Sequence, residues 1–471
     1  MGKYKKLYKN VKLLIIGSFS SKILSFILVP FYTSVLSTTE YGISDLILST
    51  TCLLAPIFTL TVSEAVMRFA LDKDNDNNQI FSIGIYTVCF GFIVLLGFSP
   101  LILLSSILRP YYLIFLIYYF THCIHEVISL FVKGIERVDV FSFNGVLGTI
   151  IIIICNIIFL VYMRIGIVGY LLSYIISSIL TSIYMLIVIR GCKYLISLRK
   201  INKTYLYEMY KYCVPMIPNS LSWWVSQSSD KYFVTAFCGV AVNGIYSVAY
   251  KIPTIMTTIS SLFVSAWQIS AVEDFGTEKS KKFYADMYNK YSSIVIITSS
   301  ILIVVTKIVA KILFNKSFFQ GWLYAPTLVF AFLFNTMASF LGTIYVSAKR
   351  SKGLMYSTLL GAGINIILNF ILISQIGALG AAIATLISYF SVWIYRVIDT
   401  RKIINITIDF KKSIICYLVI VMQIILICFN RIWSFPLALA LFIIIVIIQR
   451  QFLLDIKKIL FGSVKRLKKH K

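Results

Sequence analysis

The feature that most constrains this chain is a long series of apolar runs, each long enough to cross a membrane. A membrane-spanning helix needs about 20 apolar residues, and 59% of the 471 residues are hydrophobic. Such runs are expected to be helices, because backbone groups in lipid must hydrogen-bond within their own segment. The sequence therefore predicts an all-α, polytopic membrane protein of about 14 spans, with no room for a soluble catalytic domain. The expected spans are 12–36, 43–68, 81–107, 111–133, 141–162, 167–190, 213–238, 244–270, 291–313, 321–347, 353–375, 377–396, 412–429 and 433–450.

The cations lie mainly between these runs. The net charge of +26 is typical of a nucleic-acid-binding protein, but here the charges do not form a soluble surface. With the N-terminus inside, 34 Lys and Arg residues fall on the inner side of the predicted topology and six on the outer side. This asymmetry follows the positive-inside rule. We therefore expect a multi-pass protein with both termini in the cytoplasm and no nucleic acid partner. Two inner loops, 193–211 and 273–290, are expected to form amphipathic surface helices.

The two halves of the chain carry an internal repeat. FYTSVLSTTEYGISD (31–45) aligns with FVTAFCGVAVNGIYS (233–247), which places Gly42 on Gly244 at an offset of 202. RIGIVGYLLSY (164–174) aligns with QIGALGAAIAT (375–385) at an offset of 211. Six spans separate equivalent points, so the halves are expected to be parallel repeats with a seam between them. The predicted domains are six-helix bundles over 1–192 and 193–400, followed by two extra helices and a basic tail over 401–471.

Charged side chains inside the predicted spans mark a candidate passage, because a charge at the bilayer centre costs at least about 2.5–3.5 kcal/mol. The cations are Lys22, Arg68, Lys231 and Lys251, and the acids are Asp45, Glu64, Glu126 and Asp230. Lys22 is the strongest candidate, because no acid lies at helical spacing from it in its own span. Compact ammonium groups in a cavity suit an anion such as phosphate or pyrophosphate.

The acids leave alternatives open. Glu64 and Arg68 are four residues apart, which fits a structural salt bridge as well as a functional pair. Asp230 either pairs with Lys251 or binds a coupling cation. His122, His125 and Glu126 form HxxHE, which is not the zinc motif HExxH; we interpret it as a polar patch or proton relay and expect no metal and no cofactor. Trp223 presents an aromatic face that suits a sugar ring.

Several of these stretches resemble the Wzx-type polysaccharide flippases of the MOP exporter superfamily. The N-terminal signature is Lys22 followed by VPFYTSVLSTTEYGISDL and SEAVMRFA (63–70). The second-half signature is VPMIPNSLSWWVSQSSDKYFV (214–234) and GIYSVAYKIP (244–253), and IGALGAAIAT (376–385) resembles the junction of spans 11 and 12. At Lys231 the chain departs from relatives that carry Arg after the Asp.

The resemblance implies two six-helix bundles around a central cavity lined by Lys22, Arg68, Asp230 and Lys251. It implies transport of undecaprenyl-pyrophosphate-linked oligosaccharide, for O-antigen lipopolysaccharide or capsule, across the bacterial inner membrane by alternating access. Lys231 and Trp223 are further candidate substrate contacts, and Asp230 and Glu126 are candidates for coupling to H⁺ or Na⁺. Expected partners are the lipid bilayer, a polysaccharide polymerase and chain-length proteins. The alternative is a MATE-like antiporter of drugs or cations. We expect no enzyme, because the outer links are too short to hold an acceptor site.

Overall fold

The computed structural model describes residues 24, 26–72, 74–273, 278–348, 350–404, 407–452 and 454. These residues form helices and turns, with no strand among them. Ten helices in this part of the chain are long and apolar enough to cross a membrane. The prediction of an all-α polytopic membrane protein is therefore confirmed. The first predicted span, 12–36, lies mostly outside the described residues; its described end forms the helix Phe26–Val35.

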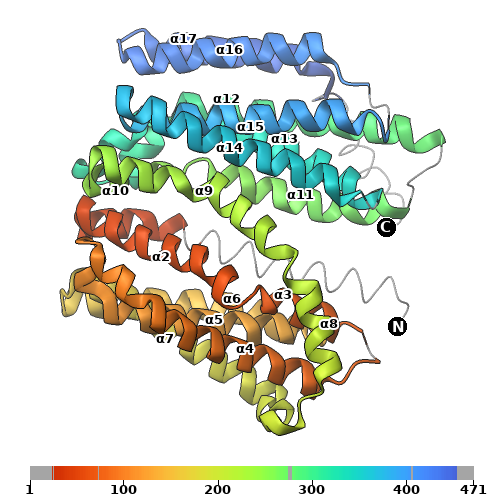
Figure 1. Cartoon of the computed structure of the whole chain (residues 1–471). Helices are drawn as coiled ribbons and strands as arrows, with labels where there is room; N and C mark the ends of the chain where they lie inside the picture. Colours follow the sequence, from red (N-terminus) through yellow and green to blue (C-terminus); the bar gives the residue numbers. More distant parts are fainter. Residues whose placement is uncertain are drawn as a thin grey trace, which may run out of the picture. The chain divides into compact units, whose positions relative to one another are not determined.

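By its contacts the chain divides into two compact units, residues 1–247 and 248–471. In the first unit, α4 to α7 lie side by side, and α3 packs against α4, α5 and α8 (Figure 1). The main helices are α2 (Thr38–Phe58), α3 (Val62–Ala70), α4 (Asn77–Phe98), α5 (Tyr112–Gly134), α6 (Val138–Asn156), α7 (Gly166–Ile189), α8 (Lys203–Cys213), α9 (Met216–Cys238) and α10 (Val240–Ala249). Short helical turns are η1 (Ser99–Leu104), η2 (Arg109–Tyr111), η3 (Ile157–Tyr162), η4 (Gly191–Tyr194) and η5 (Leu198–Lys200).

The second unit centres on α13, which packs on α11, α12 and α15, while α16 pairs with α17 and rests on α12. Its helices are α11 (Thr254–Glu273), α12 (Glu278–Leu313), η6 (Lys316–Leu323), α13 (Ala325–Ser347), α14 (Ser351–Ile376), α15 (Ala378–Thr400), α16 (Phe410–Phe429) and α17 (Ser434–Ile448). The domain boundaries predicted from the sequence repeat, at residues 192 and 400, differ in kind from this division by contacts. They stay a prediction.

Two predicted spans are interrupted, and one predicted surface helix is not separate. The span 43–68 divides into α2 and α3 because Leu60 and Thr61 turn the backbone into the left-handed region, with φ of 53° and 55°. The span 244–270 divides into α10 and α11 at a turn that contains Pro253, which lacks the N–H for a continuous helix. Residues 278–290 continue directly into the span of α12. Burial explains this, since Tyr284 and Tyr288 are fully enclosed rather than lying at a membrane surface.

The glycines aligned by the second repeat motif have the same conformational role in both halves. Gly166 begins α7 with φ of 52°, and Gly377 precedes α15 with φ of 64°. Three residues later, Gly169 and Gly380 approach the preceding segment so closely that a Cβ would lie 2.8 Å from Phe159 and 2.4 Å from the Leu372 carbonyl oxygen. Glycine is the residue that adopts a positive φ without strain, and because it has no Cβ it also allows so close an approach. The sequence repeat is therefore also a structural repeat.

Candidate functional site

The candidate site lies where α2 meets α9 and α10, all within the first unit up to Ser247. A capping box begins α2: Ser37 Oγ accepts from the Glu40 amide, and Glu40 Oε2 accepts from the Ser37 amide at 2.8 Å. Such a cap stabilises a helix by about 0.5–2 kcal/mol. Gly239, with φ of 91°, directly precedes α10. The N-termini of α2 and α10 therefore lie at defined residues, and Gly42 and Gly244 follow them on the two helices.

Glycine allows the two backbones to touch. A Cβ on Gly244 would lie 1.9 Å from the Thr38 carbonyl oxygen, and a Cβ on Gly42 would lie 2.3 Å from the Val240 carbonyl oxygen. The same Cβ positions fall 3.1 and 3.0 Å from the other glycine's amide nitrogen. Small residues at such a contact are the usual means of close helix packing in membranes. Asn243, fully buried, donates to the Gly42 carbonyl oxygen at 3.3 Å.

One turn further along, a charged pair joins α2 to α9. Lys231 Nζ lies 2.9 Å from Asp45 Oδ2 and 3.0 Å from Asp45 Oδ1, and both side chains are 15% exposed. Ser247 of α10 donates to Asp45 Oδ2 at 2.8 Å. Asp45 therefore accepts from two helices at once. We call Gly42, Asp45, Lys231, Gly244 and Ser247 the polar crossing.

Further hydrogen bonds connect α9 to α10 and to α2 near the polar crossing. Asp230 is 2% exposed and accepts from the Tyr246 hydroxyl at 2.8 Å, which ties α9 to α10. Trp224 donates to the Ser49 carbonyl oxygen at 2.8 Å, and the Tyr232 and Thr50 hydroxyls are 2.7 Å apart, which tie α9 to α2. Every one of these contacts is polar, so water can replace each of them if the helices separate.

The polar crossing brings together residues that the repeat alignment makes equivalent. Gly42 and Gly244 are equivalent by the offset of 202, and so are Asp45 and Ser247, yet each pair is in direct contact. In the second of these pairs α2 supplies a carboxylate and α10 a hydroxyl.

The remaining predicted site residues are distributed as follows. Lys22 lies outside the described residues. Arg68 is exposed and Glu64 half-buried on α3, and no ion pair joins them within the described ranges. Trp223 is half-buried on α9, where its neighbour Trp224 makes the contact with α2. Lys251 is half-buried in the turn after α10, in the second unit. Their roles as substrate contacts stay predictions.

The HxxHE patch is a polar cluster on α5. His125 Nε2 lies 3.3 Å from the Asn144 side-chain nitrogen of α6, and Glu126 is half-buried beside it. No group of three potential metal ligands occurs in the part of the chain that the structure describes. A role for Glu126 in ion coupling stays a prediction.

Sequence reasoning missed two features. It named Asp45 only as a countercharge, although the repeat alignment already paired Asp45 with Ser247. It also did not single out Arg396, which is 3% exposed in α15. Its guanidinium donates to Ser357 Oγ, Thr358 Oγ1 and the Ala338 carbonyl oxygen at 2.9, 3.2 and 2.8 Å. It thereby joins α13, α14 and α15, which no local spacing signals.

Comparisons with known proteins agree with this architecture. The family described as polysaccharide biosynthesis protein matches residues 7–268. An uncharacterized membrane protein of Methanocaldococcus jannaschii is 26% identical over 208 residues, which are 42% of this chain and 41% of that protein. The match thus spans less than half the length of this curated relative.

Solved structures resemble the chain over most of its length. The lipid II flippase MurJ, in an inward closed conformation, has a TM-score of 0.70 at 16% identity, covering 94% of this chain and 99% of that chain. A multidrug resistance MATE family transporter of the MOP superfamily, in an inward-facing conformation, has a TM-score of 0.60 at 14% identity, covering 81% and 97%. A MOP superfamily transporter from Pyrococcus furiosus has a TM-score of 0.59 at 16% identity, covering 84% and 95%. At these identities the likeness shows the fold alone.

Proposed function

This chain belongs to the polysaccharide biosynthesis protein family, and from that premise we propose that it carries undecaprenyl-pyrophosphate-linked oligosaccharide across the bacterial inner membrane. Its family and fold are those of flippases and transporters of the MOP superfamily. The proposed transport works by alternating access: one end of a passage between the repeats opens while the other closes. The sugar and pyrophosphate cross in the passage, and the lipid tail stays in the bilayer.

The polar crossing is the observation that carries the proposal. Alternating access needs a contact between repeats that is stable when closed and that can reopen in water. A buried ion pair with good geometry meets both needs, because removing one partner costs about 3–5 kcal/mol whereas solvating both charges together relieves the desolvation penalty. The Asp45–Lys231 pair, with Ser247 as a second donor, joins segments that the repeat alignment assigns to different halves, and we propose that it is such a contact.

The charge distribution supports placing the polar crossing at the outer surface. With the N-terminus inside, the positive-inside topology puts the start of α2 and the start of α10 on the outer side. The polar crossing lies in the first two turns of both helices. We propose that it closes the outer end of the passage, so that cargo enters from the cytoplasm.

Lys231 has two proposed roles. In the closed state it neutralises Asp45. When α2 and α9 separate, its ammonium group becomes free to bind the pyrophosphate, together with Lys22, Arg68 and Lys251. Asp230 and Glu126 are proposed to couple transport to H⁺ or Na⁺, and Trp223 to contact the sugar. A polysaccharide polymerase and chain-length proteins are the proposed downstream partners.

The MATE-like fold favours a second candidate, ion-coupled antiport of drugs or cations. In that case the buried Asp230 would bind the coupling ion rather than respond to an anionic cargo. Cations at Lys22, Arg68 and Lys251 argue against a cationic substrate, since like charges in a low-dielectric passage repel.

The test is glycan export in a host whose own flippase gene is deleted. The variants are Asp45→Asn, Lys231→Met and Lys22→Ala. Cells that express any one of them at a normal protein level should accumulate lipid-linked oligosaccharide on the cytoplasmic leaflet. Arg137→Gln is the matched control, because the Arg137–Asp139 pair is also an ion pair of the first unit but its side chains are 43% and 60% exposed. Accumulation on the outer leaflet would reject the flippase. Reduced sensitivity to cationic dyes on overexpression, without any effect on export, would favour the antiporter.

A further inference from the structure

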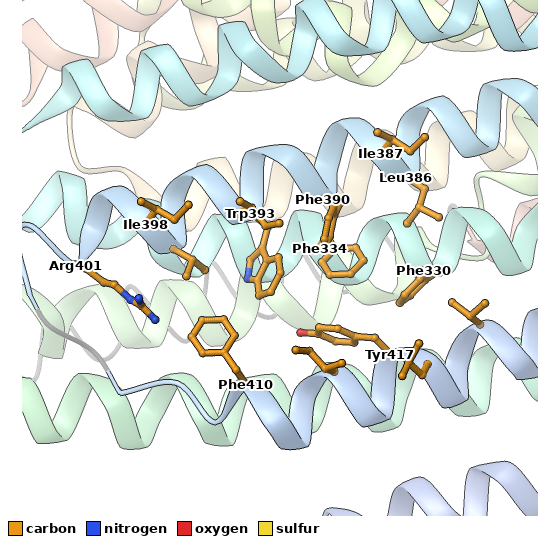
Figure 2. Close-up of a pocket in the computed structure, with 15 residues that line it drawn as sticks. Phe330, Phe334, Leu386, Ile387, Phe390, Trp393, Ile398, Arg401, Phe410 and Tyr417 are labelled. Atoms are coloured by element: carbon orange, nitrogen blue, oxygen red, sulfur yellow. The ribbon is translucent and has the colours of Figure 1, made fainter.

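The second unit contains an apolar groove that the proposed transport does not use. Its volume is about 600 Å³, within the range of ligand sites. Its walls come from α13, α15 and α16, with Phe334, Phe390 and Trp393 near its middle (Figure 2). Helix α16 rests mainly on α12 and α17, so its face toward α15 is left open. Along α15 the groove runs from Leu386 to Arg401, which is about 22 Å at the helical rise.

The groove offers nothing for a polar ligand along this length. Trp393 Nε1 points away and donates to the Tyr288 hydroxyl at 2.8 Å. The Tyr417 hydroxyl donates to the sulfur of Met337 at 3.5 Å. An extended peptide in such a groove would leave its backbone N–H and C=O groups unpaired, at a cost of several kcal/mol each. A hydrocarbon chain has no such groups, so the walls match an acyl chain.

One end of the groove is cationic. The Arg401 guanidinium lies 5.2 Å from the centre of the Phe410 ring and is exposed. Lys402 beside it already pairs with Asp399 at 3.3 Å. Asp409 caps α16 through the Lys412 amide. None of the ion pairs within the described ranges involves Arg401, so its charge is available to an anion at the mouth of the groove.

We propose that the groove binds an anionic phospholipid of the bilayer, with one acyl chain along α15 and its phosphate at Arg401. Both flanking helices, α15 and α16, are long and apolar enough to span the membrane, so the groove faces lipid. The positive-inside distribution puts the Arg401 end on the cytoplasmic side, where basic pockets between membrane helices bind anionic headgroups. The lipid fills the space between α15 and α16 and so attaches the terminal pair α16–α17 to the rest of the unit.

The test counts the lipids that the full-length protein retains. Protein reconstituted into vesicles of equimolar phosphatidylglycerol and phosphatidylcholine is extracted in mild detergent and weighed by native mass spectrometry. The wild type should retain one phosphatidylglycerol. Arg401→Gln should lower its retention about fivefold, the worth of one cation near an anionic lipid surface. Lys411→Gln is the control, because Lys411 lies in the same segment but does not line the groove.

A second pair of variants tests the acyl chain. Ile414 and Ile415 are adjacent on α16 and are 52% and 51% exposed, but only Ile414 lines the groove. Ile414→Trp should abolish retention, whereas Ile415→Trp should not change it. Equal retention of the two phospholipids, or equal effects of the paired variants, would overturn the proposal. Complete displacement of phosphatidylglycerol by an equimolar polyprenyl phosphate would also overturn it, because the groove would then hold the tail of a cargo rather than a resident lipid.

Discussion

Replacing one member of the Asp45–Lys231 pair, while the other keeps its charge, should open the polar crossing. Asp45→Asn removes the negative charge beside the Lys231 ammonium and leaves it only neutral acceptors such as Ser49 Oγ, at 3.4 Å. Lys231→Met leaves Asp45 with only Ser247 among its side-chain donors on α9 and α10. Loss of one partner of a buried pair costs about 3–5 kcal/mol. We take the lower value of about 3 kcal/mol because both side chains keep some exposure. A destabilisation of about 3 kcal/mol increases the fraction of molecules with an open polar crossing about 150-fold.

The open population can be measured as the reactivity of a buried thiol. Asn243 is fully buried and bonds to the Gly42 carbonyl oxygen beside the polar crossing. Asn243→Cys, in a chain whose nine native cysteines are replaced, should therefore react with a water-soluble maleimide only when the polar crossing opens. Each single variant should react about 150-fold faster than the parent, and the double variant Asp45→Asn/Lys231→Met should react at nearly the parental rate, because no unpaired charge remains. The reasoning fails if the double variant reacts as fast as the single variants, or if either single variant reacts at the parental rate.

Two further substitutions test the packing. Gly244→Ala should separate α2 from α10, because its Cβ would lie 1.9 Å from a carbonyl oxygen, and should accelerate the same thiol reaction at least tenfold; Gly363→Ala in α14 meets nothing within 4 Å and should not. Arg396→Lys should lower the thermal unfolding temperature in detergent more than Arg396→Met, because Lys retains the buried charge without the planar fork that reaches three acceptors. The reverse order would contradict this reasoning, because it would show that the hydrogen bonds kept by a lysine outweigh the cost of burying its charge.

The sequence predicts the helical architecture well, because a membrane span can be recognised from the apolar composition of its own residues. Each of the thirteen predicted runs within the described residues contains helix, but 43–68 and 244–270 are each divided between two helices. Local composition does not reveal the break at Leu60 and Thr61, whose strained backbone depends on tertiary contacts. It also does not show which of several intramembrane charges meet. Asp45 and Lys231 are 186 residues apart, so only the repeat alignment, by pairing Asp45 with Ser247, could have indicated that α2 contacts the second repeat there.

The unequal residues of the Asp45–Ser247 contact have a consequence for how such a protein can arise. In a dimer of identical subunits, Asp45 would face its own copy, and two carboxylates at hydrogen-bond distance would repel unless they shared a proton. A fused duplicate escapes this restriction, since each copy mutates independently. With serine in the later half and a lysine supplied by α9, Asp45 has partners that an identical copy of its own segment could not provide.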